Sequence, residues 1–380
     1  MLDTSRRTAF DETHDQFREQ VRKFLDRELT PHLEAWEQAG ITPREFWNKC
    51  GEAGLLCPTV PEEYGGLGLD FGFNAVIDEE LAYAGSTSGM TLHSDIVADY
   101  IVAYGSEEQK RHWLPRMVSG ETVTAIAMTE PGAGSDLQGI KTVARRDGDD
   151  YVVNGSKTYI TNGQHADLTI VVAKTDPTLG AKGTSLILVE AEREGYAKGR
   201  NLDKIGFHSQ DTSELFFHDV RVPATNLLGG EGQGFVYLMN QLPQERLSIA
   251  CSAQGSAQRA FDEAVKFTKE RKAFGKSVFE FQNTKFSLAD MATKLQVGWA
   301  HLDWAIRRHV AGELTAAEAS AAKLWHTELQ GEICDAALQL HGGAGYMNEY
   351  LIARLWRDAR VTRIFGGTSE IMKEVVSRSI

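Results

Sequence analysis

The spacing of apolar residues changes twice along this chain of 380 residues, and these changes constrain its fold more than any other feature. From residue 11 to about residue 119, apolar side chains recur at helical spacing, as in FREQVRKFLDREL. From about 121 to 222 the spacing falls to two residues, in runs such as YVVNGSKTYI and LTIVVAKT. Helical spacing returns from about 235 to the end. This order predicts an α+β fold.

The predicted domain boundaries lie where the spacing changes. We expect an N-terminal helical domain over residues 1–120, a middle β domain over 121–232 and a C-terminal bundle of long helices over 233–380. No long helix alternates with the predicted strands, which disfavours a doubly wound nucleotide-binding fold. Within the first domain, PEEYGGLGLDFGF (61–73) is rich in glycine and predicts a loop.

Charge and composition exclude several classes of partner. The net charge of -13 gives no basic surface for nucleic acid or an anionic membrane. No apolar run approaches the ~20 residues of a membrane span, and the N-terminus has no apolar signal-like segment. The four cysteines form no CxxC pair, and the histidines show no metal-ligand spacing. We expect a cytoplasmic protein that binds no metal, nucleic acid or membrane.

Two motifs in the β region contain groups that suit a cofactor. In IAMTEPGAGSD (126–136), a predicted strand runs into a loop whose backbone N–H groups and hydroxyls can approach a flat ring or an anion. NGSKTYITNG (154–163) predicts a turn, a short strand and another turn, with Tyr159 and Thr161 on one face. Alone, each motif is also explained by an ordinary turn or hairpin.

Three motifs follow in the C-terminal helical region. RKAFGK (271–276), with Gln282 downstream, breaks a long helix and leaves Arg271 free to hold a phosphate. QLHGGAGY (339–346) exposes backbone amides after a helix, and RIFGGTSE (363–370) reads as a loop with a Ser/Thr cap before the last helix. Alone, these are ordinary helix ends.

Together and in this order, the motifs resemble the acyl-CoA dehydrogenase family along essentially the whole chain, and LPQERL and SDLQGIKT are most similar to its long-chain branch. The resemblance implies non-covalently bound FAD and α,β-dehydrogenation of a medium- to long-chain acyl-CoA to a trans-2-enoyl-CoA, with hydride transfer to flavin N5. It also implies an electron-transferring flavoprotein as acceptor and a homotetramer.

The resemblance assigns roles to individual positions. Within one subunit, FAD contacts are expected from Ile126, Met128, Thr129, Gly134, Ser135, Tyr159 and Thr161, although many relatives have tryptophan at the Tyr159 position. From the neighbouring subunit they are expected from Arg271, Phe274, Gln282, Gln339 and Gly343. Further cofactor contacts are expected from Thr368 and Glu370, and substrate contacts from Ser135, Arg246, Gly366 and Gly367.

The catalytic base is implied by one departure from the commonest pattern. Many family members carry the catalytic glutamate where this chain has Gly366, which has no side chain. The long-chain and isovaleryl branches place it on the first long helix of the last domain, and the LPQERL segment puts Glu245 there. Glu245 is therefore the predicted base, and Pro243 is predicted to kink the helix and help place it over the flavin.

Three alternatives remain open at this point. The same fold serves flavin oxidases and monooxygenases, and the isovaleryl branch, with short branched substrates, shares the glutamate position. A non-catalytic flavin- or acyl-CoA-binding subunit is disfavoured because the FAD motifs and a base occur in one chain. Acyl-chain length depends on side-chain packing that the sequence does not set.

Overall fold

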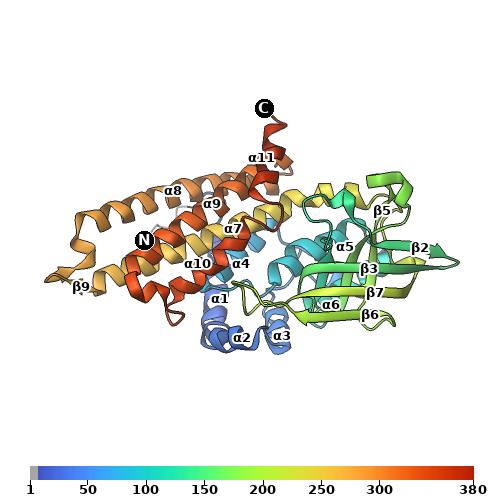
Figure 1. Ribbon diagram of the computed structural model, residues 1–380, viewed down its shortest axis with the longest axis horizontal. Helices are drawn as coiled ribbons and strands as arrows, with labels where there is room; N and C mark the ends of the chain where they lie inside the picture. Colours follow the sequence, from blue (N-terminus) through green and yellow to red (C-terminus); the bar gives the residue numbers. More distant parts are fainter. Residues whose placement is uncertain (1–6) are drawn as a thin grey trace.

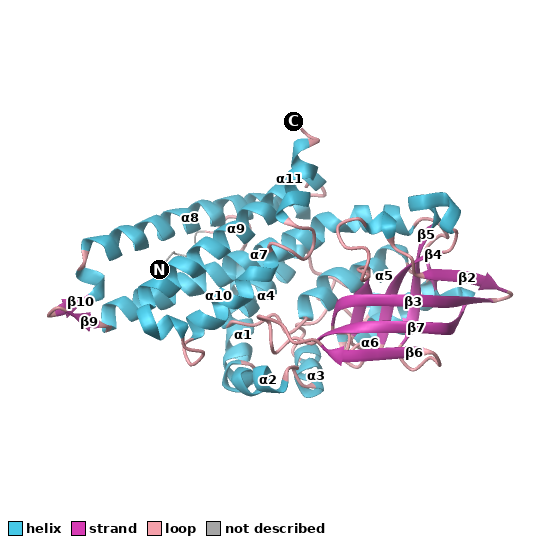
Figure 2. Ribbon diagram, in the orientation of Figure 1, coloured by secondary structure: helices cyan, strands magenta, loops and turns pink. Residues whose placement is uncertain are grey.

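The computed structural model describes residues 7–380, so residues 1–6 of the predicted first domain lie outside the described part of the chain. Helices come first, then a sheet, then long helices (Figure 1). Figure 2 shows the strands of the large sheet gathered at one end, the long helices extending away from them, and a small two-stranded hairpin at the other end. The predicted α+β architecture is confirmed.

The N-terminal region is helical and packs against one face of the sheet. Its α-helices are α1 (Glu12–Glu28), α2 (Leu33–Ala39), α3 (Arg44–Glu52), α4 (Phe71–Ala84), α5 (Ala98–Tyr104) and α6 (Glu107–Val118), with a π-helical segment, Leu92–Val97, directly before α5. The predicted loop over 61–73 is too long, because α4 already begins at Phe71. The Asp70 side chain caps that helix by accepting a hydrogen bond from Gly72 N at 2.7 Å.

The middle region forms one sheet with the strand order β6-β7-β3-β2-β4-β5-β8, and β1 pairs in parallel with β4. The strands are β1 (Thr124–Ala127), β2 (Val143–Asp147), β3 (Asp150–Thr161), β4 (Leu168–Lys174), β5 (Thr184–Glu190), β6 (Tyr196–Asn201), β7 (Thr212–Pro223) and β8 (Leu227–Leu228). Alternate residues of β4 face different cores: Ile170 and Val172 pack with the N-terminal helices, and Val171 packs in a second core on the sheet's other face.

The prediction of a turn at the start of NGSKTYITNG is wrong, because residues 154–156 lie inside the continuous strand β3. The pairing of β3 with β7 shifts once between Val153 and Gly155 and again between Lys157 and Ile160. At the second shift Tyr159 has a φ of 59°, which is not extended backbone. The regular alternation that would place Tyr159 and Thr161 on one face therefore does not hold at Tyr159.

The C-terminal region contains the longest helices. They are α7 (Gly234–Glu270), α8 (Gln282–Val310), α9 (Ala316–His341), α10 (Leu351–Thr362) and α11 (Ser369–Ser377), with a small hairpin, β9 (Lys272–Ala273) and β10 (Lys276–Ser277), between α7 and α8. Helix α4 packs closely on α7 at Gly255, where a Cβ atom would lie 2.4 Å from the carbonyl oxygen of Glu79. This contact joins the first and last regions.

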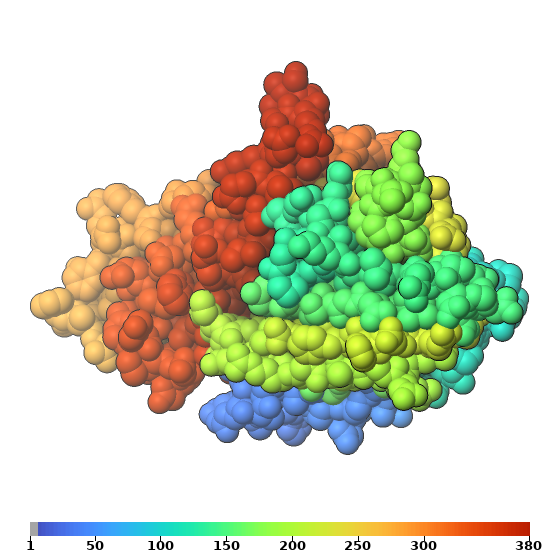
Figure 3. All heavy atoms as spheres, turned by 45° about the vertical axis from the view of Figure 1, so that its right-hand side comes forward, coloured from blue at the N-terminus to red at the C-terminus, as the bar shows by residue number. Residues whose placement is uncertain are grey.

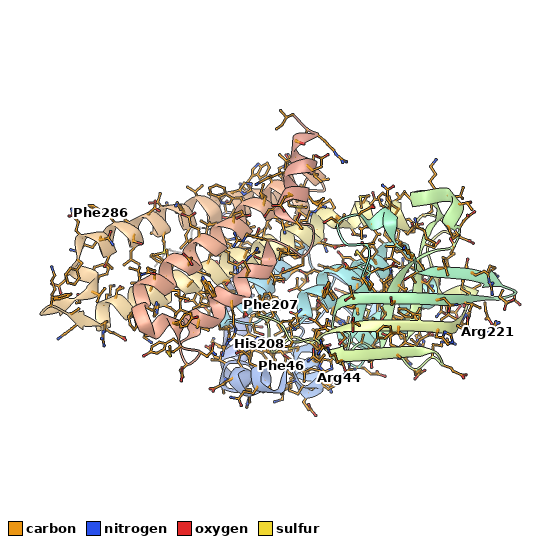
Figure 4. All side chains as sticks on the ribbon, in the orientation of Figure 1. Arg44, Phe46, Phe207, His208, Arg221 and Phe286 are labelled. Atoms are coloured by element: carbon orange, nitrogen blue, oxygen red, sulfur yellow. The ribbon has the colours of Figure 1, made fainter. Side chains whose placement is uncertain are left out.

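The molecule is elongated, with α7 running from the sheet to the β9–β10 hairpin (Figure 1). Figure 4 labels Arg221 on β7 at the sheet end and Phe286 on α8 near the hairpin end. Within residues 7–380, no helix is both long and apolar enough to cross a bilayer. The same described residues contain no group of three or more His, Cys, Asp or Glu side chains that could hold a metal ion.

Candidate active site

Glu245 lies on α7 and is buried, with 5% of its surface exposed. The hydroxyl of Tyr100, on α5, donates a hydrogen bond to Glu245 Oε1 at 2.9 Å. Burial raises the pKa of Glu245 from 4.5 to about 7, and it outweighs the opposing effects of the Tyr100 hydrogen bond and the Arg246 charge. A carboxyl group with a pKa near neutrality is suited to accept a proton from a substrate.

Pro243 lies in the interior of α7, two residues before Glu245. The helix runs on from Gly234 to Glu270, although proline has no N–H to donate to the carbonyl four residues earlier. Whether this missing bond bends the helix and aims Glu245 stays a prediction.

The loop before α11 lies directly against the part of α7 that follows Glu245. Gly366 has a φ of 64°, and a Cβ atom there would lie 2.3 Å from Cδ1 of Ile249, one helical turn after Glu245. A Cβ atom on Gly367 would lie 3.9 Å from Arg246 Nη2. The fold thus brings together the predicted base and the glycine that stands at the commoner base position.

Two buried cations, Arg246 on α7 and Lys323 on α9, lie near this loop, and Lys323 binds it directly. Arg246 Nη1 donates to Ser320 Oγ at 3.0 Å, and Lys323 Nζ donates to the carbonyl oxygen of Gly367 at 2.6 Å. Arg246 is 6% exposed and Lys323 is fully buried. At the end of the loop, Thr368 caps α11 by accepting from Ile371 N, as the sequence predicts, and Glu370 is exposed in its first turn.

The loop after β1 is fixed by a buried ion pair. Lys157 Nζ, on β3, donates to the carbonyl oxygen of Met128 at 3.0 Å and to Glu130 Oε1 at 2.9 Å. Glu130 in turn accepts from the backbone N–H groups of Lys141 and Thr142 at 2.6 and 3.0 Å. Because Thr158 N also donates to the Thr129 carbonyl at 2.9 Å, this loop and β3 are held together at three points.

The remaining predicted contacts of the sheet lie around this loop. Ile126 is buried in β1, whereas Gly134 and Ser135 are exposed in the loop. Tyr159 exposes 70% of its surface, and Thr161 Oγ1 accepts a hydrogen bond from Gln210 at 3.3 Å. On the face shown in Figure 3, the loop after β1 borders the segment that leads into α11, as it also does in Figure 1.

A third group of predicted contacts lies at the other end of the molecule. Arg271, Gln339 and Gly343 line one surface hollow of about 400 Å³. Phe274 is 95% exposed at the turn of the β9–β10 hairpin, and the exposed Gln282 begins α8. From Glu245 to the end of α7 at Glu270 the helix rises roughly 37 Å, so these residues are far from the base in their own chain.

Sequence reasoning missed Tyr100, Glu130 and Lys157. In the sequence, Tyr100 lies in a helical segment rich in apolar residues and cannot be distinguished from a tyrosine of the hydrophobic core. Its hydrogen-bond partner, Glu245, is 145 residues further along the chain. Lys157 gave a weak indication of a buried ion pair, because a lysine within a predicted strand needs a counter-ion if it is buried.

Family models for acyl-CoA dehydrogenases match nearly the whole chain. The N-terminal domain model matches residues 11–121, the middle domain model matches 125–220 and the C-terminal domain model matches 232–380.

Individual relatives agree with these models. The pig (Sus scrofa) "long-chain specific acyl-CoA dehydrogenase, mitochondrial" is 50% identical over 100% of this chain and 89% of its own length. The potato (Solanum tuberosum) "isovaleryl-CoA dehydrogenase, mitochondrial" is 37% identical over 98% of this chain and 91% of its own.

Solved structures show the same fold. A crystal structure of an acyl-CoA dehydrogenase from Geobacillus kaustophilus has a TM-score of 0.96 and 53% identity, covering 97% of this chain and 98% of that one. A glutaryl-CoA dehydrogenase from Mycobacterium smegmatis in complex with FADH2 has a TM-score of 0.93 and 30% identity, covering 99% and 96%. The domain matches, the sequence identities and the shared fold together establish that this chain belongs to the acyl-CoA dehydrogenase family of oxidoreductases.

Proposed function

We propose that this chain is an FAD-dependent acyl-CoA dehydrogenase that oxidises medium- to long-chain acyl-CoA to trans-2-enoyl-CoA with Glu245 as the base. The observation that carries the proposal is the buried Glu245 carboxyl, with a pKa of about 7, on the helix against which the Gly366 loop packs. The 50% identity to a relative named as long-chain specific favours a long substrate. The 37% identity to an isovaleryl-CoA dehydrogenase keeps a short branched substrate as the alternative.

The residues around the β1 loop fit a flavin. An exposed tyrosine ring, a threonine hydroxyl and a loop with open space at Gly132 and Gly134 offer a flat apolar contact beside polar backbone groups. Met128, Thr129, Tyr159 and Thr161 would hold FAD in one subunit, and the hollow lined by Arg271, Gln339 and Gly343 would hold it from a neighbour. FAD, when bound, supplies the acceptor for the hydride that leaves the β carbon.

The chain's own groups would activate the α carbon. Glu245 would accept the α proton, and the backbone N–H of Gly366 would donate to the thioester carbonyl as negative charge develops there. Arg246 and Lys323 would help to hold that loop and its helix in place, and burial would keep water away from the base.

The proposal extends to partners and location. An electron-transferring flavoprotein would accept the electrons, and a homotetramer would complete the FAD sites. The cytoplasmic location stays a prediction, and the pig and potato relatives are named as mitochondrial.

The first test is Glu245→Gln. We expect this variant to retain FAD, because Glu245 is not among the proposed FAD contacts, and to slow anaerobic flavin reduction by acyl-CoA by roughly a thousandfold. The matched control is Glu263→Gln. This change removes a carboxylate that is paired with Arg259 on the same helix, and the flavin of the variant should be reduced at the normal rate. Near-normal flavin bleaching in Glu245→Gln would contradict the assignment of the base.

A second measurement names the substrate and separates the oxidase alternative. The wild-type protein is mixed anaerobically with butyryl-, octanoyl-, palmitoyl- and isovaleryl-CoA while flavin absorbance is followed. Fastest bleaching with octanoyl- or palmitoyl-CoA supports the proposal, whereas fastest bleaching with isovaleryl-CoA selects the branched-chain alternative. Rapid reoxidation of the reduced protein by air would instead indicate an oxidase.

A further inference from the structure

Tyr100 makes the one side-chain hydrogen bond described for Glu245, and it is not among the residues proposed to bind FAD or substrate. Its side chain is fully buried, so its hydroxyl has no access to solvent. Burial, together with the neighbouring Glu245 charge, raises the pKa of Tyr100 well above its ordinary value. Tyr100 therefore stays protonated near neutral pH and can act as a hydrogen-bond donor.

The segment that carries Tyr100 is fastened to α7 on both sides of Glu245. Gln244 Nε2 donates to the backbone carbonyl of Asp95 at 2.7 Å, and Ser248 Oγ donates to Asp95 Oδ2 at 2.7 Å. Asp95 lies in the π-helical segment that leads into α5, and such irregular turns often occur at functional sites. The two helices are thus locked in register over the single turn that holds the base.

We propose that Tyr100 is a positioning residue for the reaction: its hydroxyl orients the Glu245 carboxylate and stabilises its ionised form. This inference rests on the proposed function, in which Glu245 is the base. A charge-assisted hydrogen bond in a buried site favours the ionised acceptor, so Tyr100 offsets part of the cost of burying this charge.

Other charged groups near Glu245 also affect the ionisation of its carboxyl group, and their effects must be distinguished from that of Tyr100. Arg246, its neighbour on α7, favours the ionised form, whereas Asp99 on α5 would oppose it when ionised. Burial and the charges of Asp95 and Glu245 raise the pKa of Asp99 to about 8, so Asp99 is mostly neutral near pH 7. Tyr100 and Arg246 are therefore the two groups that favour the ionised carboxylate there.

The test is Tyr100→Phe, which keeps the ring and removes only the hydroxyl. The measurement is the pH dependence of kcat/KM for flavin reduction in the FAD-loaded protein. The rising limb of this profile gives the pKa of the base in the free enzyme. We expect the pKa of the rising limb to move up by about one unit, and the rate near pH 7 to fall about fivefold because fewer molecules carry the ionised base. At high pH most of this loss should be recovered.

The control is Tyr104→Phe, one helical turn further along α5, where the ring stacks on Tyr237. It should leave the pH profile in place, and FAD content and Tm would show whether either variant is folded. An unshifted profile in folded Tyr100→Phe, or an equal shift in Tyr104→Phe, overturns the inference. Failure of the proposed function would give a different result, namely normal flavin reduction by acyl-CoA in Glu245→Gln.

Discussion

At the scale of single residues, Glu245 should lower the stability of the fold at neutral pH. Its pKa is about 7 in the folded protein and near 4.5 in an unfolded chain, so between these values the folded state holds a proton that the unfolded state has lost. Stability therefore falls as pH rises through this window, by about 3 kcal/mol in total. Glu245→Gln cannot ionise and should be more stable than wild type by up to that amount near pH 8.

Thermal or urea unfolding at a series of pH values checks this expectation. The advantage of Glu245→Gln should shrink as the pH falls and vanish near pH 4, where the wild-type carboxyl is neutral in both states. Glu263→Gln, which removes a partly exposed carboxylate from the same helix, is measured in parallel as the control for loss of a carboxylate on α7. Parallel stability curves for Glu245→Gln and wild type would mean that Glu245 ionises as easily in the fold as in the unfolded chain.

The sequence could predict Glu245 but not its environment. The resemblance to the family predicts Glu245 as the base, because Gly366 has no side chain at the commoner position, and this role stays a prediction. The structure adds that a side chain at Gly366 would meet Ile249, and this contact depends on how the last loop packs on α7. Tyr100 was not predictable for the same reason, because its hydrogen bond exists only through the packing of α5 on α7.

At the scale of elements, the Lys157–Glu130 pair should govern how well the β1 loop holds FAD. Lys157→Met removes the donor to the Met128 carbonyl and leaves Glu130 with a buried charge that has lost its counter-ion. We expect FAD affinity to fall about tenfold or more, measured by titrating apoprotein with FAD. Lys174→Met is the matched control, since Lys174 tethers Gly180 and Thr184, outside the proposed FAD contacts.

A double variant distinguishes an effect on the position of the β1 loop from an effect on the stability of the whole protein. Glu130→Gln together with Lys157→Met removes the unpaired charge, so the Tm of the apoprotein should recover relative to the single variant. FAD affinity should stay low, because the Met128 carbonyl still lacks its donor. Recovery of both quantities would show that the pair matters only for folding.

The spacing of apolar residues predicts which helices and strands exist better than it predicts their boundaries and irregularities. The helical and β regions follow directly from apolar spacing, which reflects burial on one face. Residues 154–156 read as a turn because Asn and Gly favour turns, but in the fold they form an irregularity within β3, where pairing with β7 outweighs the local preference. Likewise, the glycines of 61–73 conceal the start of α4, which Asp70 fixes.

At the scale of the whole molecule, the predicted FAD contacts fall in two separate parts of one chain, one around the β1 loop and one at the hairpin end of α7. The Gly366 loop, which the β1 loop borders, packs on α7 at Ile249, and from there to Glu270 the helix rises roughly 31 Å. Large apolar side chains are exposed toward the hairpin end and along α8, including Phe274, Phe286 and Val297. A second subunit that covers them would also bring Arg271 to the neighbour's β1 loop, so the site would be shared between subunits.

Subunit complementation tests this shared site with two variants that are each inactive. Glu245→Gln disables the base, and Arg271→Glu disables the contact given to the neighbour's FAD. In a mixed dimer, one site contains both defects, whereas the other combines an intact Glu245 with an intact Arg271 from the partner. Co-expressed and purified through two different tags, the mixed oligomer should therefore regain about half of the wild-type flavin reduction per dimer. Glu245→Gln co-expressed with Glu245→Ala should regain nothing. A mixed oligomer of the first pair that stays inactive would place Arg271 and Glu245 in the same site of one chain. Normal flavin reduction by Arg271→Glu alone would remove Arg271 from the site.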